Sequence, residues 1–248
     1  RPGNFVTSYV SVGRRAGRTN FNGSFQFTND EGVLDLLKGF RRENFRLNVD
    51  HALADNFDLG MGAFYARSNA DQGEDTGIFF GMRFLEPNIK LDSIVTSGPF
   101  AGMYNPKVKQ APLSGNVSNP LYVLQQQDVE DSRDRFTGTF RANYRPLSWL
   151  TFEGNVGYDQ TGINYKSYVP LGYANSAGST SKGSLYERSN SDRSYNAGLT
   201  AATNFTWGIV HNTTKGALLY EDQTNQRVTV NAPALTVPRV TEFSAAAQ

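Results

Sequence analysis

Apolar and polar residues alternate strictly along several stretches of the chain. Residues 44–50 show the pattern clearly, because Phe45, Leu47 and Val49 occupy every second position and the residues between them are polar. The same alternation recurs near residues 21–28, 57–65, 135–144, 150–159 and 195–202. A period of two indicates β-strands that have one apolar face and one polar face.

About eight strands are expected, near residues 4–12, 19–28, 40–51, 56–67, 134–145, 149–160, 190–204 and 208–222. Their connections are alternately short and long. The short ones cover residues 52–56, 146–149 and 204–207, and the long ones cover residues 68–132 and 161–189. Short turns on one side and long loops on the other are typical of outer-membrane barrels. The predicted fold class is therefore all-β, an antiparallel transmembrane β-barrel with long extracellular loops.

The strand length also favours a membrane barrel. Trp149 and Tyr158 bracket the apolar face of one predicted strand. Nine steps of about 3.3 Å, tilted by about 40°, span about 23 Å, close to the apolar band of about 25 Å in such barrels. Aromatic residues gather near the short turns: Trp149, Trp207, Tyr144, Phe57 and Phe205. They fit an aromatic girdle at one membrane interface, the alternative being that they close a soluble core.

Composition excludes several classes of function. The 248 residues contain 24 Lys and Arg against 23 Asp and Glu, so the net charge of +1 gives no electrostatic reason to expect a nucleic-acid partner. The chain has no cysteine, which excludes disulfides, thiolate metal sites and a cysteine nucleophile. It has 24 glycines, and 29 of its aromatic residues are Phe or Tyr, a profile that argues against a helical bundle or a doubly wound α/β enzyme.

Alternation alone does not decide whether eight strands close into a small barrel or belong to a larger one. Charged residues in the polar rows suit either a packed small interior or the wall of a wide lumen. Residues 241–248 do not form a membrane strand, although a barrel in lipid needs its last strand to pair with its first. We therefore expect a segment of a larger barrel.

Several motifs support that expectation by resemblance. Residues 39–50 resemble a strand of the SusC/RagA-type TonB-linked outer-membrane transporters, and residues 144–150 resemble a short periplasmic turn of that family. Residues 79–89 and the Asn-Pro-Leu sequence at 119–121 resemble its long loop, and residues 217–222 resemble a later strand. The likeness extends over roughly residues 17–240, in the family's order and spacing.

The resemblance implies a barrel of roughly 22 strands with a plugged lumen. Residues 1–248 would be a middle part of that single barrel domain, and the plug and the TonB-contacting segment would lie outside this chain. The family imports oligosaccharides or peptides across the bacterial outer membrane, driven through TonB and the proton-motive force. A SusD-type surface lipoprotein usually forms a lid. The implied surroundings are outer-membrane lipid, the TonB complex, the lipoprotein and the solute, with no nucleic acid.

Two sets of residues are candidates for contact with other molecules. The polar rows are expected to face the plug or the solute through Arg46, Asn48, Asp50, Arg141, Asn143, Glu153 and Asn155. Aromatic residues in the long loops are expected to stack on sugar rings or pack on a lid protein, namely Phe84, Tyr104, Tyr122 and Tyr168. The alternative for the aromatic set is that it packs the loops against themselves, since loops of this length need apolar packing to be ordered.

No catalytic, metal or cofactor site is predicted. His51 and His211 are isolated from each other in sequence, and the acidic residues 69–75 do not match a calcium loop. Two other functions remain open: a small complete outer-membrane barrel with an adhesive or structural role, and a secreted sugar-binding β-sandwich. The length of the reading frame separates the first from a transporter segment. Burial of Phe45, Phe140, Phe152 and Leu199 between two sheets would favour the second.

Overall fold

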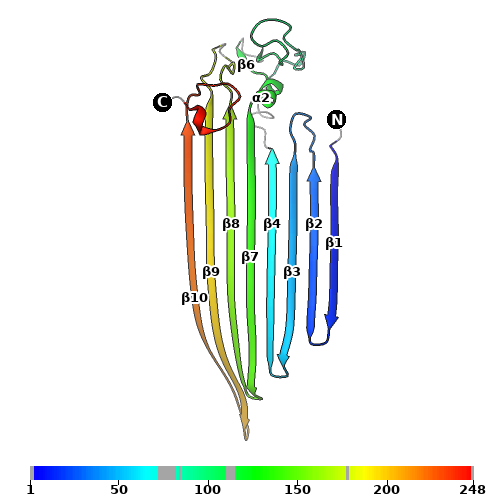
Figure 1. The fold of residues 1–248 in the computed structure, drawn as a ribbon, viewed down its shortest axis with the longest axis vertical. Coiled ribbons are helices and arrows are strands. Elements are labelled where there is room, and N and C mark those ends of the chain that lie inside the picture. Colours follow the sequence, from blue (N-terminus) through cyan, green and yellow to red (C-terminus); the bar gives the residue numbers. More distant parts are fainter. Residues whose placement is uncertain (1–2, 72–81, 84, 110–114, 177–178, 247–248) are drawn as a thin grey trace.

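Eight long strands form one antiparallel sheet. The computed structural model describes residues 3–71, 82–83, 85–109, 115–176 and 179–246. The strands lie in the order β1-β2-β3-β4-β7-β8-β9-β10 (Figure 1). Their bounds are β1 Phe5–Ala16, β2 Thr19–Asp30, β3 Phe40–Ala54, β4 Phe57–Asp71, β7 Asp128–Leu147, β8 Leu150–Val169, β9 Ser184–Trp207 and β10 Val210–Ala232. Because these strands are neighbours in a single layer, the β-sandwich alternative is wrong.

Tight turns close one end of the sheet, called here the turn end. Each of the four hairpins there has two residues outside the strand pairing, at 17–18, 55–56, 148–149 and 208–209. Gly17 and Gly208 have φ of +56° and +62°, the backbone region that such turns require and that glycine adopts without strain. The turn predicted at 204–207 is wrong by a few residues, because β9 continues to Trp207. The long connections lie at the opposite end, the loop end (Figure 1).

The strands are longer than the sequence pattern predicted. β7 pairs with β8 from Asp128, and β8 pairs with β9 as far as Val169, inside the predicted loops 68–132 and 161–189. β9 and β10 remain paired as far as Leu185 and Ala232. Near the loop end both faces of the strands carry polar side chains, so the hydrophobic alternation disappears although backbone hydrogen bonding continues.

The predicted separation of the two faces is confirmed. Direct register partners Phe25, Phe45, Tyr65 and Phe136 form an aromatic row across four strands. The face that carries this row is the apolar face, and its part between the row and the turn end is the apolar band. Phe45, Phe140 and Leu199 are exposed on it, and none lies between two sheets. Phe152 on the same face is half-buried.

The connection between β4 and β7 folds over the loop end. Its described elements are β5 Lys107–Lys109, β6 Asn116–Ser118 and the helix α2 Pro120–Gln126. Asn119, which is fully buried, caps α2 by accepting a hydrogen bond from the Leu121 N–H at 3.1 Å. Its Nδ2 donates to the Leu91 carbonyl at 2.8 Å, so one side chain ties the helix to an earlier part of the same connection. The Asn-Pro-Leu motif thus has a structural role.

The C-terminal segment, residues 233–246, folds back over the loop ends of β8, β9 and β10 (Figure 1). Leu235 packs with Tyr168, Leu185 and Ala232 in a small hydrophobic core. Lys166 Nζ donates to the Thr241 carbonyl at 2.7 Å, and the Arg239 N–H donates to the Tyr168 hydroxyl at 3.0 Å. The segment therefore forms a cover of the sheet and not a further strand.

Candidate functional site

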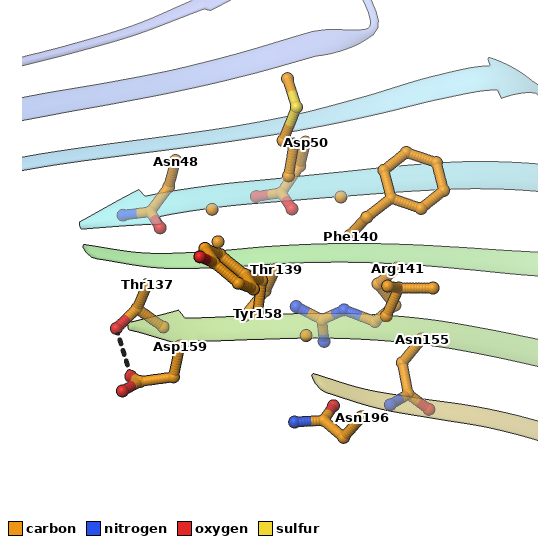
Figure 2. Close-up of a pocket in the computed structure, with 16 residues that line it drawn as sticks. Asn48, Asp50, Thr137, Thr139, Phe140, Arg141, Asn155, Tyr158, Asp159 and Asn196 are labelled. Atoms are coloured by element: carbon orange, nitrogen blue, oxygen red, sulfur yellow. Dashed lines mark hydrogen bonds between the residues drawn. The ribbon is translucent and has the colours of Figure 1, made fainter. Parts of the chain in front are cut away.

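The strand register gathers polar side chains into two neighbouring rows on the polar face. One row runs across four strands through Asp50, Gly60, Arg141 and Asn155. The next row toward the loop end has equivalent positions at Asn48, Gly62, Thr139, Gly157 and Asn196. Together they line a shallow hollow that we call the polar groove (Figure 2).

Glycines form part of the floor of the polar groove, and neighbouring side chains occupy the space above them. A Cβ on Gly60 would lie 3.1 Å from Asp50 Oδ1 and 3.7 Å from Arg141 Nε. The carboxylate from β3 and the guanidinium from β7 therefore converge over β4. Because glycine has no side chain, the Asp50 and Arg141 side chains can approach the backbone of β4 closely.

Two asparagines also lie over glycines between β8 and β9. Asn155 Oδ1 lies 2.5 Å from the position of a Cβ on Gly198, and Asn196 Oδ1 lies 2.5 Å from that of a Cβ on Gly157. Each asparagine leans over the glycine that is its register partner on the neighbouring strand. The two amides thus present donors and acceptors side by side in the polar groove (Figure 2).

The charges of the polar groove differ in whether they are paired. Among the described residues, neither Asp50 nor Arg141 forms a side-chain hydrogen bond or an ion pair. At the loop-end margin, by contrast, Asp159 accepts a hydrogen bond from the Thr137 hydroxyl at 2.6 Å and pairs with Arg135 at 2.8 Å (Figure 2). The charges of Asp50 and Arg141 are therefore available to another molecule, whereas the charge of Asp159 is already neutralised by Arg135 within the sheet.

The structure distributes the predicted polar residues over several hollows of the same face. Asn48, Asp50, Arg141 and Asn155 line the polar groove. Arg46 lies in a neighbouring hollow, with its guanidinium 5.3 Å from the centroid of the Phe64 ring. Asn143 lies nearer the turn end, and its buried Oδ1 has no hydrogen-bond partner. Its register partner on β8, Glu153, is exposed.

The predicted set lacks two polar residues of the rows that line the polar groove, as well as the Thr137–Asp159 pair at their loop-end margin. Thr139 and Asn196 line the polar groove together with the predicted set (Figure 2). Their alternation with apolar neighbours marks them as polar-face residues. Only the register shows that they lie beside Asn48 and across Gly157.

The aromatic loop residues occupy different environments. Tyr122 is 1% exposed, packs at 5.2 Å from the Tyr173 ring, and its hydroxyl accepts a hydrogen bond from the Ala174 N–H at 2.9 Å. Burial raises the pKa of the Tyr122 hydroxyl, although the Ala174 hydrogen bond opposes this shift. Tyr168 is buried under the C-terminal segment, whereas Tyr104 is half-buried. Phe84 lies outside the described residues. Contact with a sugar or a lid stays a prediction, and of the three described residues Tyr104 is the most exposed, although it packs against the cluster of Tyr122 and Tyr173.

The described residues contain neither a membrane-spanning helix nor a group of metal-ligating side chains. No helix there is both long and apolar enough to cross a bilayer. Over the same residues, His, Asp and Glu side chains do not gather in threes as a metal ion would require.

Comparison with known proteins identifies the fold. No model of a known protein family matches the chain, and neither does any curated protein sequence. Solved structures do match: a chain of the RagAB peptide transporter superposes with a TM-score of 0.74 at 14% identity. RagAB peptide importer chains in the closed-closed and open-open states match with the same TM-score at 15% identity.

These matches cover 98% of this chain but only 26% to 27% of the RagAB chains, so the chain spans about a quarter of their length. At this identity the likeness concerns the fold. The eight-stranded sheet has the fold of a segment of the barrel in these transporter chains.

Proposed function

We propose that the chain is part of the wall of a TonB-dependent outer-membrane importer of peptides or oligosaccharides. Residues 1–248 lie within one transmembrane barrel domain, and the protein acts by gated passage and not by bond chemistry. Two observations support this proposal. One is the fold likeness to RagAB transporter chains, and the other is that apolar residues of the apolar face are exposed in the apolar band but buried at the loop end.

The second observation carries the membrane assignment. Leu199 in the apolar band is 51% exposed, whereas Leu185 at the loop end of the same strand is 0% exposed. They lie an even number of positions apart in an uninterrupted strand, so both lie on the apolar face. The C-terminal segment covers Leu185, and the described chain does not cover Leu199. Acyl chains around the apolar band would supply the missing apolar contact.

The polar face then lines the lumen. Arg46, Asn48, Asp50, Arg141, Asn143, Glu153 and Asn155 are proposed to contact the plug or the solute. Unpaired charged groups such as Asp50 and Arg141 support this role, because a polar wall needs partners from the groups that fill the barrel. A SusD-type lipoprotein would meet the loop end, where Tyr104 is half-buried.

Membrane insertion is the first test. The full-length protein that contains this chain should sediment with outer membranes, and the unheated sample should migrate faster on a gel than the heated one. Recovery in the soluble fraction without detergent would contradict the proposal.

Transport is tested separately in cells that produce the inserted protein. Uptake of labelled peptides or oligosaccharides should require both TonB and the proton-motive force. Uptake that continues without TonB would argue against the gating mechanism while leaving the membrane assignment intact.

A further inference from the structure

A second group of side chains on the polar face lies at the loop end of β8, β9 and β10. Tyr165 of β8 and Arg188 of β9 are direct register partners. Alternation along β8 places Tyr165 on the same face as Asn155 of the polar groove. The Arg188 guanidinium lies 5.4 Å from the centroid of the Tyr165 ring, and the Tyr186 ring lies edge-on to that ring at 6.0 Å.

Arg188 has an unused donor. Its Nε is buried and has no hydrogen-bond partner. Among the described residues no carboxylate pairs with this guanidinium. Because protein atoms enclose the Nε, a ligand would meet the guanidinium through its terminal amino groups, which also form no hydrogen bond or ion pair within the described chain. A guanidinium held without an acceptor favours a ligand that supplies one.

A second arginine adds positive charge at the same place. Arg227 of β10 pairs in register with Asn190, two residues from Arg188 along β9, and its Nε donates to Asn190 Oδ1 at 3.0 Å. No acidic side chain of the described chain neutralises Arg227 either.

Two arginines of the same face at the loop end of β7 are different. Arg133 pairs with Asp131 at 3.0 Å, and Arg135 pairs with Asp159 at 2.8 Å. At the loop end, the sheet therefore neutralises Arg133 and Arg135 of β7 and leaves Arg188 of β9 and Arg227 of β10 without a carboxylate partner.

We propose that Arg188 and Arg227 form a subsite for carboxylate groups of the solute, with Tyr165 and Tyr186 as its aromatic side. The planar guanidinium offers paired N–H donors that match a carboxylate, and stacking on Tyr165 holds the Arg188 side chain in position. Acidic side chains or the terminal carboxylate of a peptide, or uronic acids of an oligosaccharide, can supply the group. The inference rests on the proposed function, since it places the subsite at the entrance of a lumen.

The test measures binding to the detergent-solubilised full-length protein. The probes are tetraglutamate, its uncharged analogue tetraglutamine, and trigalacturonate. At least one acidic probe should bind, and it should bind about tenfold more weakly to the Arg188→Gln variant, in keeping with loss of a charge-assisted hydrogen bond. Loss for tetraglutamate alone identifies a peptide carboxylate, and loss for trigalacturonate alone identifies a uronic acid.

The matched control is Arg193→Gln. Arg193 lies on the same strand but on the apolar face, an odd number of residues from Arg188. This variant removes the same charge and should leave binding unchanged. Equal weakening in both variants, equal binding of tetraglutamine, or acidic-probe binding that is absent or unaffected by Arg188→Gln would overturn the proposal.

Folding is monitored in each variant by heat-modifiable migration. If Arg188→Gln does not fold, Arg227→Gln is the second variant, because it leaves the Arg188–Tyr165 contact in place. Loss of heat-modifiable migration in the wild type would contradict the proposed function itself. Normal migration without discrimination between the probes would contradict only the carboxylate subsite.

Discussion

The two parts of the apolar face differ in whether the chain buries their side chains. In the apolar band, Phe140 and Leu199 are exposed at the surface of the described chain. At the loop end, Tyr168 and Leu185 lie on the same face but are buried under the C-terminal segment. One continuous set of backbone hydrogen bonds supports both parts. The chain thus covers its apolar residues where water is expected and leaves them bare where lipid is proposed, which argues for a membrane boundary between the two parts.

The largest expected effect comes from placing a charge in the apolar band. Phe140→Arg should cost up to about 4 kcal/mol, because arginine near the middle of the bilayer loses its hydration. The fraction of protein that inserts and shows heat-modifiable migration should fall sharply.

Thr139→Arg is the matched control, since Thr139 is the next residue and faces the polar groove (Figure 2). It should insert like the wild type. Equal insertion of both variants would show that the apolar band does not face lipid.

Leucine truncations on β9 sharpen the comparison directly. Leu185→Ala should cost about 3 kcal/mol, because it opens a cavity in the core beneath the C-terminal segment. Hydrogen exchange in residues 233–246 should rise accordingly. Leu199→Ala removes a side chain that leaves no enclosed cavity, so exchange in that segment should stay unchanged. Similar exchange in the two variants would mean that Leu185 does not hold the segment.

Tyr122→Phe tests the packing of the loops at a smaller scale. It leaves the buried Ala174 N–H without its acceptor and should cost about 1–2 kcal/mol locally. Proteolysis within residues 85–109, 115–127 and 170–176 should become faster, while the strands stay protected.

The same residue predicts a pH dependence. Because burial raises the pKa of Tyr122 in the folded loop, the folded state retains its proton when the opened loop begins to lose it. Loop stability is therefore constant below the ordinary tyrosine pKa of about 10 and falls as the pH rises above it. Tyr122→Phe should remove this part of the alkaline loss, and an unchanged profile would assign it to other groups.

The smallest effect compares two glycines of β8 on opposite faces. A Cβ on Gly157 would lie 2.5 Å from Asn196 Oδ1, so Gly157→Ala should displace that amide and cost about 1 kcal/mol. Gly154 faces open space, and Gly154→Ala should change the urea midpoint little or raise it slightly. If Gly157→Ala is equally harmless, the polar groove has room that the structure does not indicate.

Much of the sheet could be predicted because alternation is a local property. Each residue of a strand points away from its neighbours, so Phe45 and Arg46 were assigned to opposite faces without knowledge of their surroundings. The pattern failed at the loop end for the same reason. Residues 161–169 are paired strand, but Ile163, Tyr165 and Val169 fall on the polar face and Tyr168 on the apolar face, so the alternation of the preceding residues does not continue.

The candidate site depended on information that the pattern lacks. Asp50 and Arg141 are far apart in sequence and converge because both strands pair with β4 at Gly60. Tyr122 was expected, from its place in a long loop, either to contact a ligand or to pack the loops, and only its contacts with Tyr173 and Ala174 place it inside the loop packing. Such contacts join residues from different loops.

By itself, the sequence determined that the chain is built of strands with an apolar and a polar face, because side-chain direction follows from backbone geometry at each residue. Only the tertiary structure decided which polar groups meet over which glycine and which apolar residues the chain covers for itself. Those outcomes depend on strand register and on long-range packing, which act between residues that no local pattern connects.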